Sequence, residues 1–499
     1  MNNKCGGLLL GALLLVSGLL ATPALAQTQN QDRADDVVIR ARGGLDAPVM
    51  DLESCVAQAL RTNDALQAER LRMEELDGQM DQALSTGLPT LDLVGNWRRS
   101  RNPAMALDET FAGGGGGLAP PAGSPDWFNQ WIMGFGSFLP AVEDIPAQSY
   151  LSASLNLNWK INPMKTGGAV GAARLGIQRQ ELNERAVEHA TTQQVMVAYW
   201  SIIRAAQQVE AVRAQLVNQT ELLDIIRLQY DLGLVTRLDT LQAAVALANT
   251  KPRLEVAQAE LRNAGAHLNT LMGVEPGNPL AVVNDSRLEL QPLRDDVALT
   301  LAQQRPQLQA AETFTDILRR NRRAQKSENM PYLSLAGSYG YIGKKFDSVF
   351  DDGHDNWSVA ASVTVPLFDG MLNRGLVAQT EAQIRRTETE LQGQRRQAQV
   401  EVLDLLANLR LARGLLDAVT LNLENAEEVL EESLLMLELG KTRYLDVLVA
   451  EANRTEARSN VIAAHHEVLT LTAGLKRALG YSPLTQLQDI PNLVAEVSR

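Results

Sequence analysis

The sequence predicts an α+β fold in which long antiparallel, coiled-coil-like helical hairpins are joined to four β-strands. Three observations predict it: the chain repeats itself, two very long segments lack proline, and four short segments alternate apolar and polar residues. A long proline-free helical pattern favours one continuous helix, whereas alternation with a period of two favours a strand with one apolar face. The repeat predicts that each kind of element occurs twice, in the same order.

The repeat is clearest in two twelve-residue stretches, 232–243 and 439–450. They align without gaps at an offset of 207 and share six residues. In each stretch a long helical pattern ends at a glycine, which suits the left-handed backbone that closes a helix. A new helix then starts near an aspartate, a residue that favours helix starts. Each stretch is therefore predicted to form the tip of a helical hairpin. The residues concerned are Gly233, Asp239, Gly440 and Asp446.

The segment before the first strand is predicted to hold a signal, an arm and a helix. Residues 1–26 have a positive start, an apolar core and a small-residue end, as secretory signals do. Residues 27–50 are polar and mixed, and they are expected to form a loose N-terminal arm. Apolar residues then recur every three or four positions over 51–85, which predicts a helix that ends before Pro89. Cys55 would be the single cysteine left after the signal, so no intrachain disulfide is expected.

Four strands are predicted at about 89–101, 149–161, 331–343 and 356–367. In the second of them, every odd position from Leu151 is apolar and every even position is polar. The segments 89–161 and 331–368 hold 16 of the 22 Phe, Trp and Tyr residues. Alternating strands with aromatic enrichment and long polar loops are typical of an outer-membrane β-barrel wall.

Four strands cannot close a barrel. Two interpretations therefore stay open: a sheet at the edge of a soluble domain, or strands from several chains in one barrel. The export signal favours the second. The glycine- and proline-rich stretch 111–146 is interpreted as a long loop. Beyond the signal, no stretch approaches the 18 apolar residues of a transmembrane helix.

Two proline-free segments, 166–232 and 371–439, are predicted to be long helices. At 1.5 Å per residue each would span ~100 Å, far more than a globular helix. Their Ala, Leu, Gln, Glu and Arg content is that of coiled coils, so bundling or oligomerisation is expected. The predicted division of the mature chain is a first repeat, a connector, a second repeat and a C-terminal tail, at residues 51–276, 277–295, 296–483 and 484–499.

Neither catalysis nor nucleic-acid binding is predicted. The formal net charge is −13, and no basic patch with interleaved aromatic residues occurs. His466 and Glu467 begin like a zinc-protease motif, but Thr470 stands where the second histidine is required. His465 and His466 are interpreted as surface residues. We therefore expect no enzyme, no metal site and no cofactor.

Several short motifs occur in a fixed order along the chain. Residues 50–56 and 305–308 are predicted helix starts, 88–93 and 330–335 resemble the strand start "LPxLxL", 365–370 resemble the strand exit "VPLFDGG", and both tips resemble "LGxxxxLDVLxA". Together and in this order, these motifs resemble those of the TolC-type outer-membrane efflux factors, and the resemblance covers roughly residues 51–483.

The resemblance implies a homotrimer that builds one twelve-stranded barrel in the outer membrane of a Gram-negative bacterium, surrounded by outer-membrane lipid. It also implies a periplasmic helical tunnel whose tips meet a periplasmic adaptor protein linked to an inner-membrane pump. The channel itself would be passive and would open when the adaptor binds. The tip residues implied for adaptor contact are Gly233, Leu234, Leu238, Asp239, Gly440, Lys441, Arg443 and Leu445. Asp446 would lie at the pore mouth.

Several alternatives stay open beside this reading. The same fold would serve type I protein secretion, and a soluble periplasmic coiled-coil scaffold is a third possibility. Asp239 and Asp446 have a plain role as helix caps. The sequence also departs from the family pattern twice: Val449 replaces a second gate aspartate found in some members, and the first strand exit, 158–163, lacks the Pro-Leu-Phe-Asp-Gly pattern.

Overall fold

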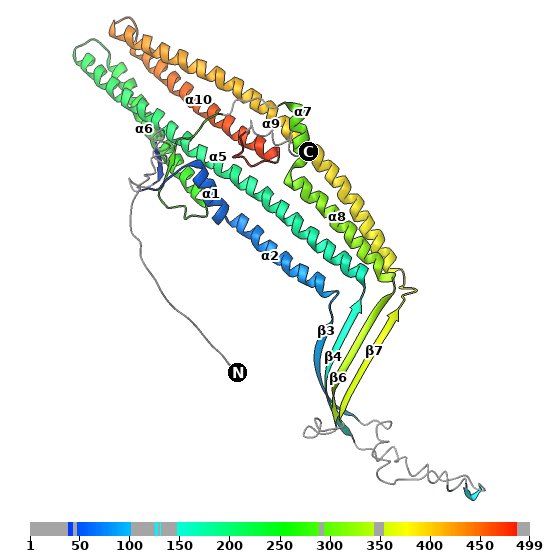
Figure 1. Ribbon diagram of the computed structural model, residues 1–499. Helices are drawn as coiled ribbons and strands as arrows, with labels where there is room; N and C mark the ends of the chain where they lie inside the picture. Colours follow the sequence, from blue (N-terminus) through cyan, green and yellow to red (C-terminus); the bar gives the residue numbers. More distant parts are fainter. Residues whose placement is uncertain are drawn as a thin grey trace, which may run out of the picture.

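The computed structural model is an elongated wall of helices with a β-sheet at one end and both hairpin tips at the other (Figure 1). The structure describes residues 38–42, 47–100, 125–127, 130, 147–288, 294–343 and 354–486. The expected signal, most of the glycine- and proline-rich loop and residues 487–499 of the tail lie outside the described residues.

The predicted long helices and their hairpins are confirmed. Helix α5 spans Pro163–Asp231 and returns as α6, Arg237–Leu271. Helix α9 spans Leu372–Glu438 and returns as α10, Tyr444–Ala478. Pro252 lies inside α6 without ending it. No helix of the described part combines the length and the apolar character needed to cross a bilayer.

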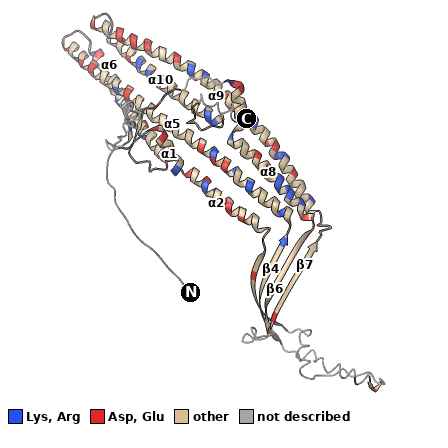
Figure 2. Ribbon diagram, in the orientation of Figure 1, with Lys and Arg blue, Asp and Glu red and all other residues tan. Residues whose placement is uncertain are grey.

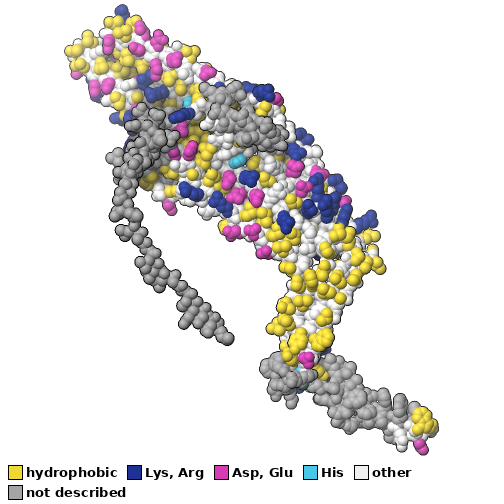
Figure 3. All heavy atoms as spheres, viewed as in Figure 1, with side chains coloured by type: hydrophobic (Ala, Val, Ile, Leu, Met, Phe, Trp, Pro, Cys, Tyr) yellow, Lys and Arg dark blue, Asp and Glu magenta, His cyan; other side chains and the backbone are white. Residues whose placement is uncertain are grey.

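The four predicted strands form one antiparallel sheet in the order β3-β4-β6-β7. Their register places apolar residues in rows across the sheet: Leu93 pairs with Leu155, Leu155 with Tyr339, and Tyr339 with Trp357. All four side chains are exposed in the single chain. The sheet carries few charges (Figure 2), and its surface is largely apolar (Figure 3). The bounds are β3 Thr90–Ser100, β4 Gln148–Ile161, β6 Tyr332–Gly343 and β7 Asp355–Thr364.

Four helices continue from the sheet as a wall. Helix α2, Asp64–Ser85, leads into β3, and α8, Pro306–Lys326, leads towards β6 through the short 3-10 helix η4, Ser327–Asn329. In the wall α5 packs between α2 and α8, and α8 packs between α5 and α9 (Figure 1). Helices α5 and α8 approach closely, because a Cβ on Gly168 would lie 2.7 Å from the Cβ of Ala324.

The two exits from strand to long helix differ, as the sequence predicts. After β4 the chain enters α5 at once, with the Asn162 side chain accepting a hydrogen bond from the Lys165 amide at 3.1 Å. After β7 a longer turn precedes α9, with Gly370 and Met371 both at φ +70°. Asp369 closes this turn by accepting a hydrogen bond from the Asn373 amide at 2.9 Å.

The single helix predicted over 51–85 is wrong, because the chain breaks at Asn63. Helix α1 covers Leu52–Thr62, and Asn63 then caps α2 by accepting a hydrogen bond from the Ala65 amide at 3.0 Å. The break is held by tertiary contacts, since Asn63 also donates to the Leu271 carbonyl at 2.9 Å. The apolar periodicity continues across the break and therefore conceals it.

The predictions of a loose arm at 27–50 and of a connector without secondary structure at 277–295 are also wrong. Strands β1, Val38–Arg42, and β2, Val49–Met50, lie in the arm, and β5, Leu280–Val283, lies in the connector. They form a three-stranded sheet in the order β1-β5-β2, which packs against the middle of α5 and the last turns of α6. Helix α7, Asp295–Leu301, begins at the end of the connector, and the 3-10 helix η3, Ala302–Gln304, follows it.

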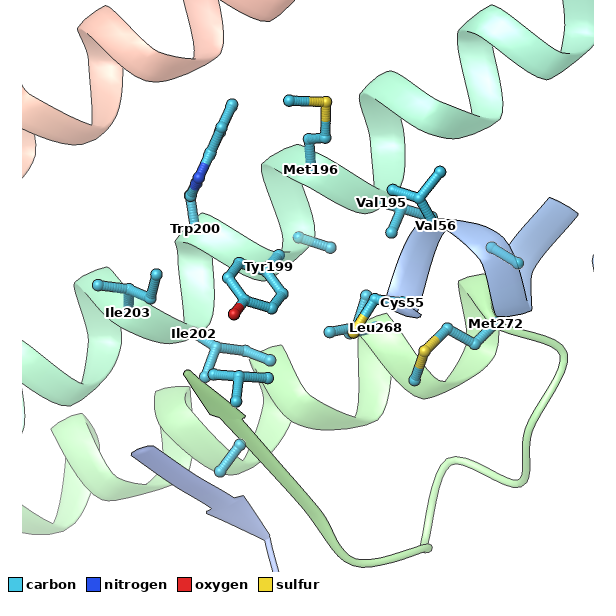
Figure 4. Close-up of a cluster of buried hydrophobic side chains, with 14 of the residues drawn as sticks. Cys55, Val56, Val195, Met196, Tyr199, Trp200, Ile202, Ile203, Leu268 and Met272 are labelled. Carbon is cyan, nitrogen blue, oxygen red and sulfur yellow. The ribbon is translucent and has the colours of Figure 1, made fainter. Parts of the chain in front are cut away.

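The main core lies under this small sheet (Figure 4). Tyr199 of α5 is fully buried there, and its hydroxyl donates to the Val283 carbonyl of β5 at 2.5 Å. Cys55 of α1 is buried in the same cluster, and burial beside Asp51 raises the pKa of its thiol to about 12. Because the thiolate is the reactive form, Cys55 is a packing residue.

Candidate functional site

Both tips end their long helices with the same hydrogen-bond pattern. Gly233 lies at φ +75° and donates its amide to the Tyr230 carbonyl at 2.9 Å, while the Leu234 amide reaches the Gln229 carbonyl at 2.8 Å. The second tip repeats this: Gly440, at φ +67°, donates to the Leu437 carbonyl at 3.0 Å, and the Lys441 amide to the Met436 carbonyl at 2.8 Å. This is the Schellman motif, so both glycines end helices as the sequence predicts.

Each aspartate is the third residue of a return helix and accepts a hydrogen bond from the amide of the N-cap residue, as in a capping box. The N-cap residue is Thr236 in α6 and Arg443 in α10. Asp239 accepts hydrogen bonds from the Thr236 amide at 2.8 Å and the Thr236 hydroxyl at 2.7 Å, and these bonds lower the pKa of its carboxyl. Asp446 accepts them from the Arg443 amide at 3.2 Å and the Thr442 hydroxyl at 3.0 Å. The capping interpretation is therefore confirmed for both residues. The Arg443 guanidinium lies 3.9 Å from the Asp446 carboxylate, an exposed pair of small energetic weight.

Large apolar side chains are exposed at both tips. Leu234 is 71% exposed and Leu445 is 42% exposed, and Lys441 and Arg443 are exposed beside them. Apolar side chains gathered on a projecting end are typical of a partner site. Leu234, Leu238 and Leu445 belong to this exposed set, and the sequence predicts all three as tip residues. Three further exposed leucines of the tips were not predicted. Leu232 and Leu439 each directly precede a tip glycine, which was the available signal, and Leu241 lies in the first turns of α6.

The two tips share one apolar core, so they form a single structural unit at one end of the molecule (Figure 1). The cluster draws buried residues from all four helices: Leu222, Leu223 and Ile226 of α5, Ala243 of α6, Leu430 of α9, and Tyr444, Val447 and Ala450 of α10. Neither hairpin can therefore move at its tip without breaking apolar contacts with the other. We call this group the tip core.

A buried carboxyl lies directly after the tip core. Glu451 of α10 is 2% exposed, and burial raises the pKa of its carboxyl. Asn218 of α5 and Arg454 act in the opposite direction, but burial outweighs them. The Tyr444 hydroxyl, seven residues earlier on the same helix, is also buried, and burial raises its pKa too.

We expect acid to stabilise the packing around Glu451. A carboxyl whose folded pKa is raised contributes stability that is fully present below its unfolded pKa and lost as the pH rises through the folded pKa. Hydrogen exchange of residues 444–457, measured from pH 4.5 to 8, should therefore show protection that falls with rising pH. The change Glu451→Gln should flatten this dependence, whereas Glu456→Gln, at an exposed position on the same helix, should keep it. An unchanged slope in Glu451→Gln would contradict the assignment.

The interpretation of His465 and His466 as surface residues is wrong for His466. Its Nε2 lies 3.1 Å from the Ser201 hydroxyl of α5, so it joins the two hairpins. Burial, with a contribution from Arg204, lowers the pKa of His466 to about 4, which keeps the ring neutral near pH 7. His465 is half-buried as well, and burial lowers its pKa. In the described ranges, no three His, Cys, Asp or Glu residues are grouped as a metal site would require.

Comparison with known proteins identifies the family. The model of the family "Outer membrane efflux protein" matches residues 55–274 and 299–481. The chain is 22% identical to "Outer membrane protein TolC" of Vibrio cholerae over 346 residues, which cover 68% of this chain and 79% of that protein. It is 23% identical to "Alkaline protease secretion protein AprF" of Pseudomonas aeruginosa over 351 residues, 67% and 70% of the two chains.

A solved structure shares the fold. The CmeC outer membrane channel of Campylobacter jejuni superposes with a TM-score of 0.71 at 16% identity, over 90% of this chain and 89% of that one. The helical hairpins and the four-stranded sheet described above are therefore those of a known channel architecture. Together with the family match over most of the sequence, this shows that the chain belongs to the outer membrane efflux protein family and is an outer-membrane channel subunit.

Proposed function

We propose that three copies of this chain form the exit duct of a tripartite efflux pump, and that an adaptor protein opens the duct by binding the helical tips. The observation that carries the proposal is the division of the molecule into two ends. At one end, β3 and β7 form the two outer edges of the sheet, and neither edge pairs with another strand of the described residues. At the other end, exposed apolar residues project on paired tips.

The open edges support a shared barrel. An unpaired strand edge is a template for pairing with another chain, and four strands alone cannot close. Pairing of β7 in one copy with β3 in the next would remove every edge. Three copies then supply twelve strands, and the exposed apolar rows of the sheet would face lipid.

Asp446 is proposed to line the periplasmic mouth of this duct. Three-fold symmetry would bring three carboxylates together, which favours cations and costs repulsion in the closed state. The hydrogen bonds from Arg443 and Thr442 hold each carboxylate at the start of its helix. Val449 stands where some relatives of this type carry a second acid, so one acidic ring is expected rather than two.

Opening is proposed to be a movement of the tips against the tip core. A partner shifts such an equilibrium only if it binds the open state more tightly than the closed state. The exposed leucines of the tips offer contacts for this, because much of their surface is open and they are not part of the tip core. No chemical step is required, and solute would pass through the opened duct.

The direct test is a photo-crosslinking residue at Lys441 in living cells, followed by mass spectrometry of the captured protein. We expect a periplasmic adaptor, whose own inner-membrane pump would identify the cargo class. The control places the photo-crosslinking residue at Arg262 instead, which lies about 38 Å along α6 from the first residue of that helix. This position should not capture an adaptor that is bound at the tip. A clean trimer without a captured partner, during active export, would contradict the proposed opening mechanism.

Type I protein secretion is the second candidate function. The relative "Alkaline protease secretion protein AprF" favours it, because that protein is named for protein secretion. The crosslinking experiment separates the two functions through the pump that accompanies the captured adaptor. The third function, a soluble periplasmic scaffold, does not fit, because the chain belongs to an outer-membrane family.

A further inference from the structure

The junction between the sheet and the helices carries exposed apolar side chains. The turn from β7 to α9 exposes the most apolar surface: Leu367 is 92% exposed and Phe368 is 79% exposed. All four connections between a strand of the sheet and a helix carry such side chains, so the apolar surface of the strands continues onto the ends of the helices (Figure 3). We call these residues the apolar collar: Leu88, Met164, Met330, Leu367, Phe368, Met371 and Leu372.

Basic side chains gather next to the apolar collar, at the sheet end of α8 and α9 (Figure 3). Residues 317–326 of α8 hold five basic residues and no acidic residue, in a chain whose net charge is −13. The third residue of α9, Arg374, is three positions after Met371 of the collar. The basic residues of α8 are Arg319, Arg320, Arg322, Arg323 and Lys326.

Several of these charges are neutralised within the chain. Arg319 contacts Glu388 at 2.7 Å, and Arg322 and Lys326 contact Glu381 at 3.7 and 3.5 Å. Arg320, Arg323 and Arg374 differ from them: all three are exposed, and the described residues give them no ion pair. These three arginines are the basic belt.

The basic belt lies at the depth of lipid headgroups if the collar lies in the membrane. At 1.5 Å per residue, Arg323 and Arg320 are ~5 and ~9 Å from the last residue of α8. Long arginine side chains place their alkyl part along apolar surface and their charge at the interface. A guanidinium binds phosphate oxygens in a bidentate manner, so headgroup phosphate is the chemical partner that fits.

We propose that Arg320, Arg323 and Arg374 bind the phosphate groups of anionic phospholipids in the leaflet that faces the periplasm. The inference rests on the proposed function, because only an inserted channel brings the collar into a bilayer. Two contacts would then set the depth of the channel in the membrane. The apolar collar lies in the hydrocarbon, and the basic belt binds the headgroups on the periplasmic side. Juxtamembrane basic residues are attracted to anionic lipid in this way.

A second copy of the chain is the competing occupant. The sheet end of α2 is acidic, with Glu74, Asp77 and Asp81, and α2 and α9 are the two outer helices of the wall. A neighbouring α2 could therefore meet Arg374. Arg320 and Arg323 lie on α8, which has α5 on one side and α9 on the other. Lipid is the occupant that all three arginines share.

The test uses the full chain reconstituted in phosphatidylcholine vesicles, with spin-labelled phosphatidylglycerol or phosphatidylcholine as probe. We expect the anionic probe to associate about fivefold more strongly, and salt to reduce this preference. The variant Arg320→Gln/Arg323→Gln/Arg374→Gln should lose it. The matched control Lys251→Gln/Arg253→Gln/Arg262→Gln removes three exposed charges from α6 and should keep it.

Equal association of both probes with the unmodified protein, or a preference retained by the belt variant, would overturn the inference. So would a belt variant whose trimers dissociate while its lipid preference is intact, because this outcome assigns the arginines to a subunit contact. If neither probe shows an immobilised population, the protein is not in the bilayer, and the proposed channel itself fails. The two failures are thus distinguishable.

Discussion

Replacing Gly340 with valine is expected to remove the channel from the outer membrane. Gly340 lies in β6 opposite Ser154 of β4. A Cβ at this position would lie 2.3 Å from the Ala153 carbonyl oxygen and 2.6 Å from the Ser154 Cα. These are backbone atoms of the neighbouring strand, so they can yield only if the ladder between β4 and β6 opens. We expect a loss of roughly 3 kcal/mol or more and a sheet divided at its centre.

Gly337, three residues earlier in the same strand, provides the matched control. A Cβ there would meet nothing nearer than the Ser358 carbonyl oxygen at 4.0 Å, so Gly337→Val should assemble normally. The measurement is the amount of trimer in the outer-membrane fraction, detected by its altered mobility when the sample is not heated. Equal amounts of trimer for the two variants would show that the sheet tolerates a side chain at Gly340 after all.

Gly337 and Gly340 differ in a way that the sequence could not predict. Alternation of apolar residues predicts the strand that contains both of them, and the observed strand covers Tyr332–Gly343. The sequence does not distinguish Gly337 from Gly340, because the close approach depends on the position of a neighbouring strand almost 190 residues away. Local periodicity therefore locates the strand, and only the register identifies the residue that cannot change.

The small sheet was not predictable in the same way. Strands β2 and β5 have two and four residues, too few for a period to be recognised. The pairing of Ile39 with Val282 joins segments that are separated by the whole first repeat. The β-branched pair Val38-Ile39 was the available signal, but it is embedded in a polar segment. The break at Asn63 escaped for a related reason, because contacts with the end of α6 hold it.

The tips were predictable because the repeat marks them twice, and the helix caps follow from residue type. The buried carboxyl beside them was not. At the offset of 207, Glu451 aligns with Ala244, so the residue departs from the repeat. A glutamate in a helix is usually solvated, and the packing of α10 against its neighbouring helices buries this one. Asymmetry between the two hairpins is thus visible in the structure and not in the motif.

The double change Leu234→Asp/Leu445→Asp is expected to abolish export while leaving the trimer intact. Both side chains are exposed at the tips and are absent from the tip core, so aspartate should fold there without strain. If the tips bind an adaptor, the new carboxylates must be desolvated in the interface, which costs several kcal/mol unless they are paired. Loss of two apolar anchors alone would weaken binding by about 30-fold or more.

The measurement is adaptor co-purification together with the sensitivity of cells to the exported compounds, compared with a strain that lacks the channel. Leu234→Met/Leu445→Met keeps apolar side chains of similar volume and should behave like the unmodified protein. If the aspartate variant loses adaptor and export together while its trimers persist, the tips act by contact with a partner. If it exports normally, the exposed leucines have no partner, and the opening of the duct must be driven from another surface, of which the lateral faces of α6 and α10 are the nearest.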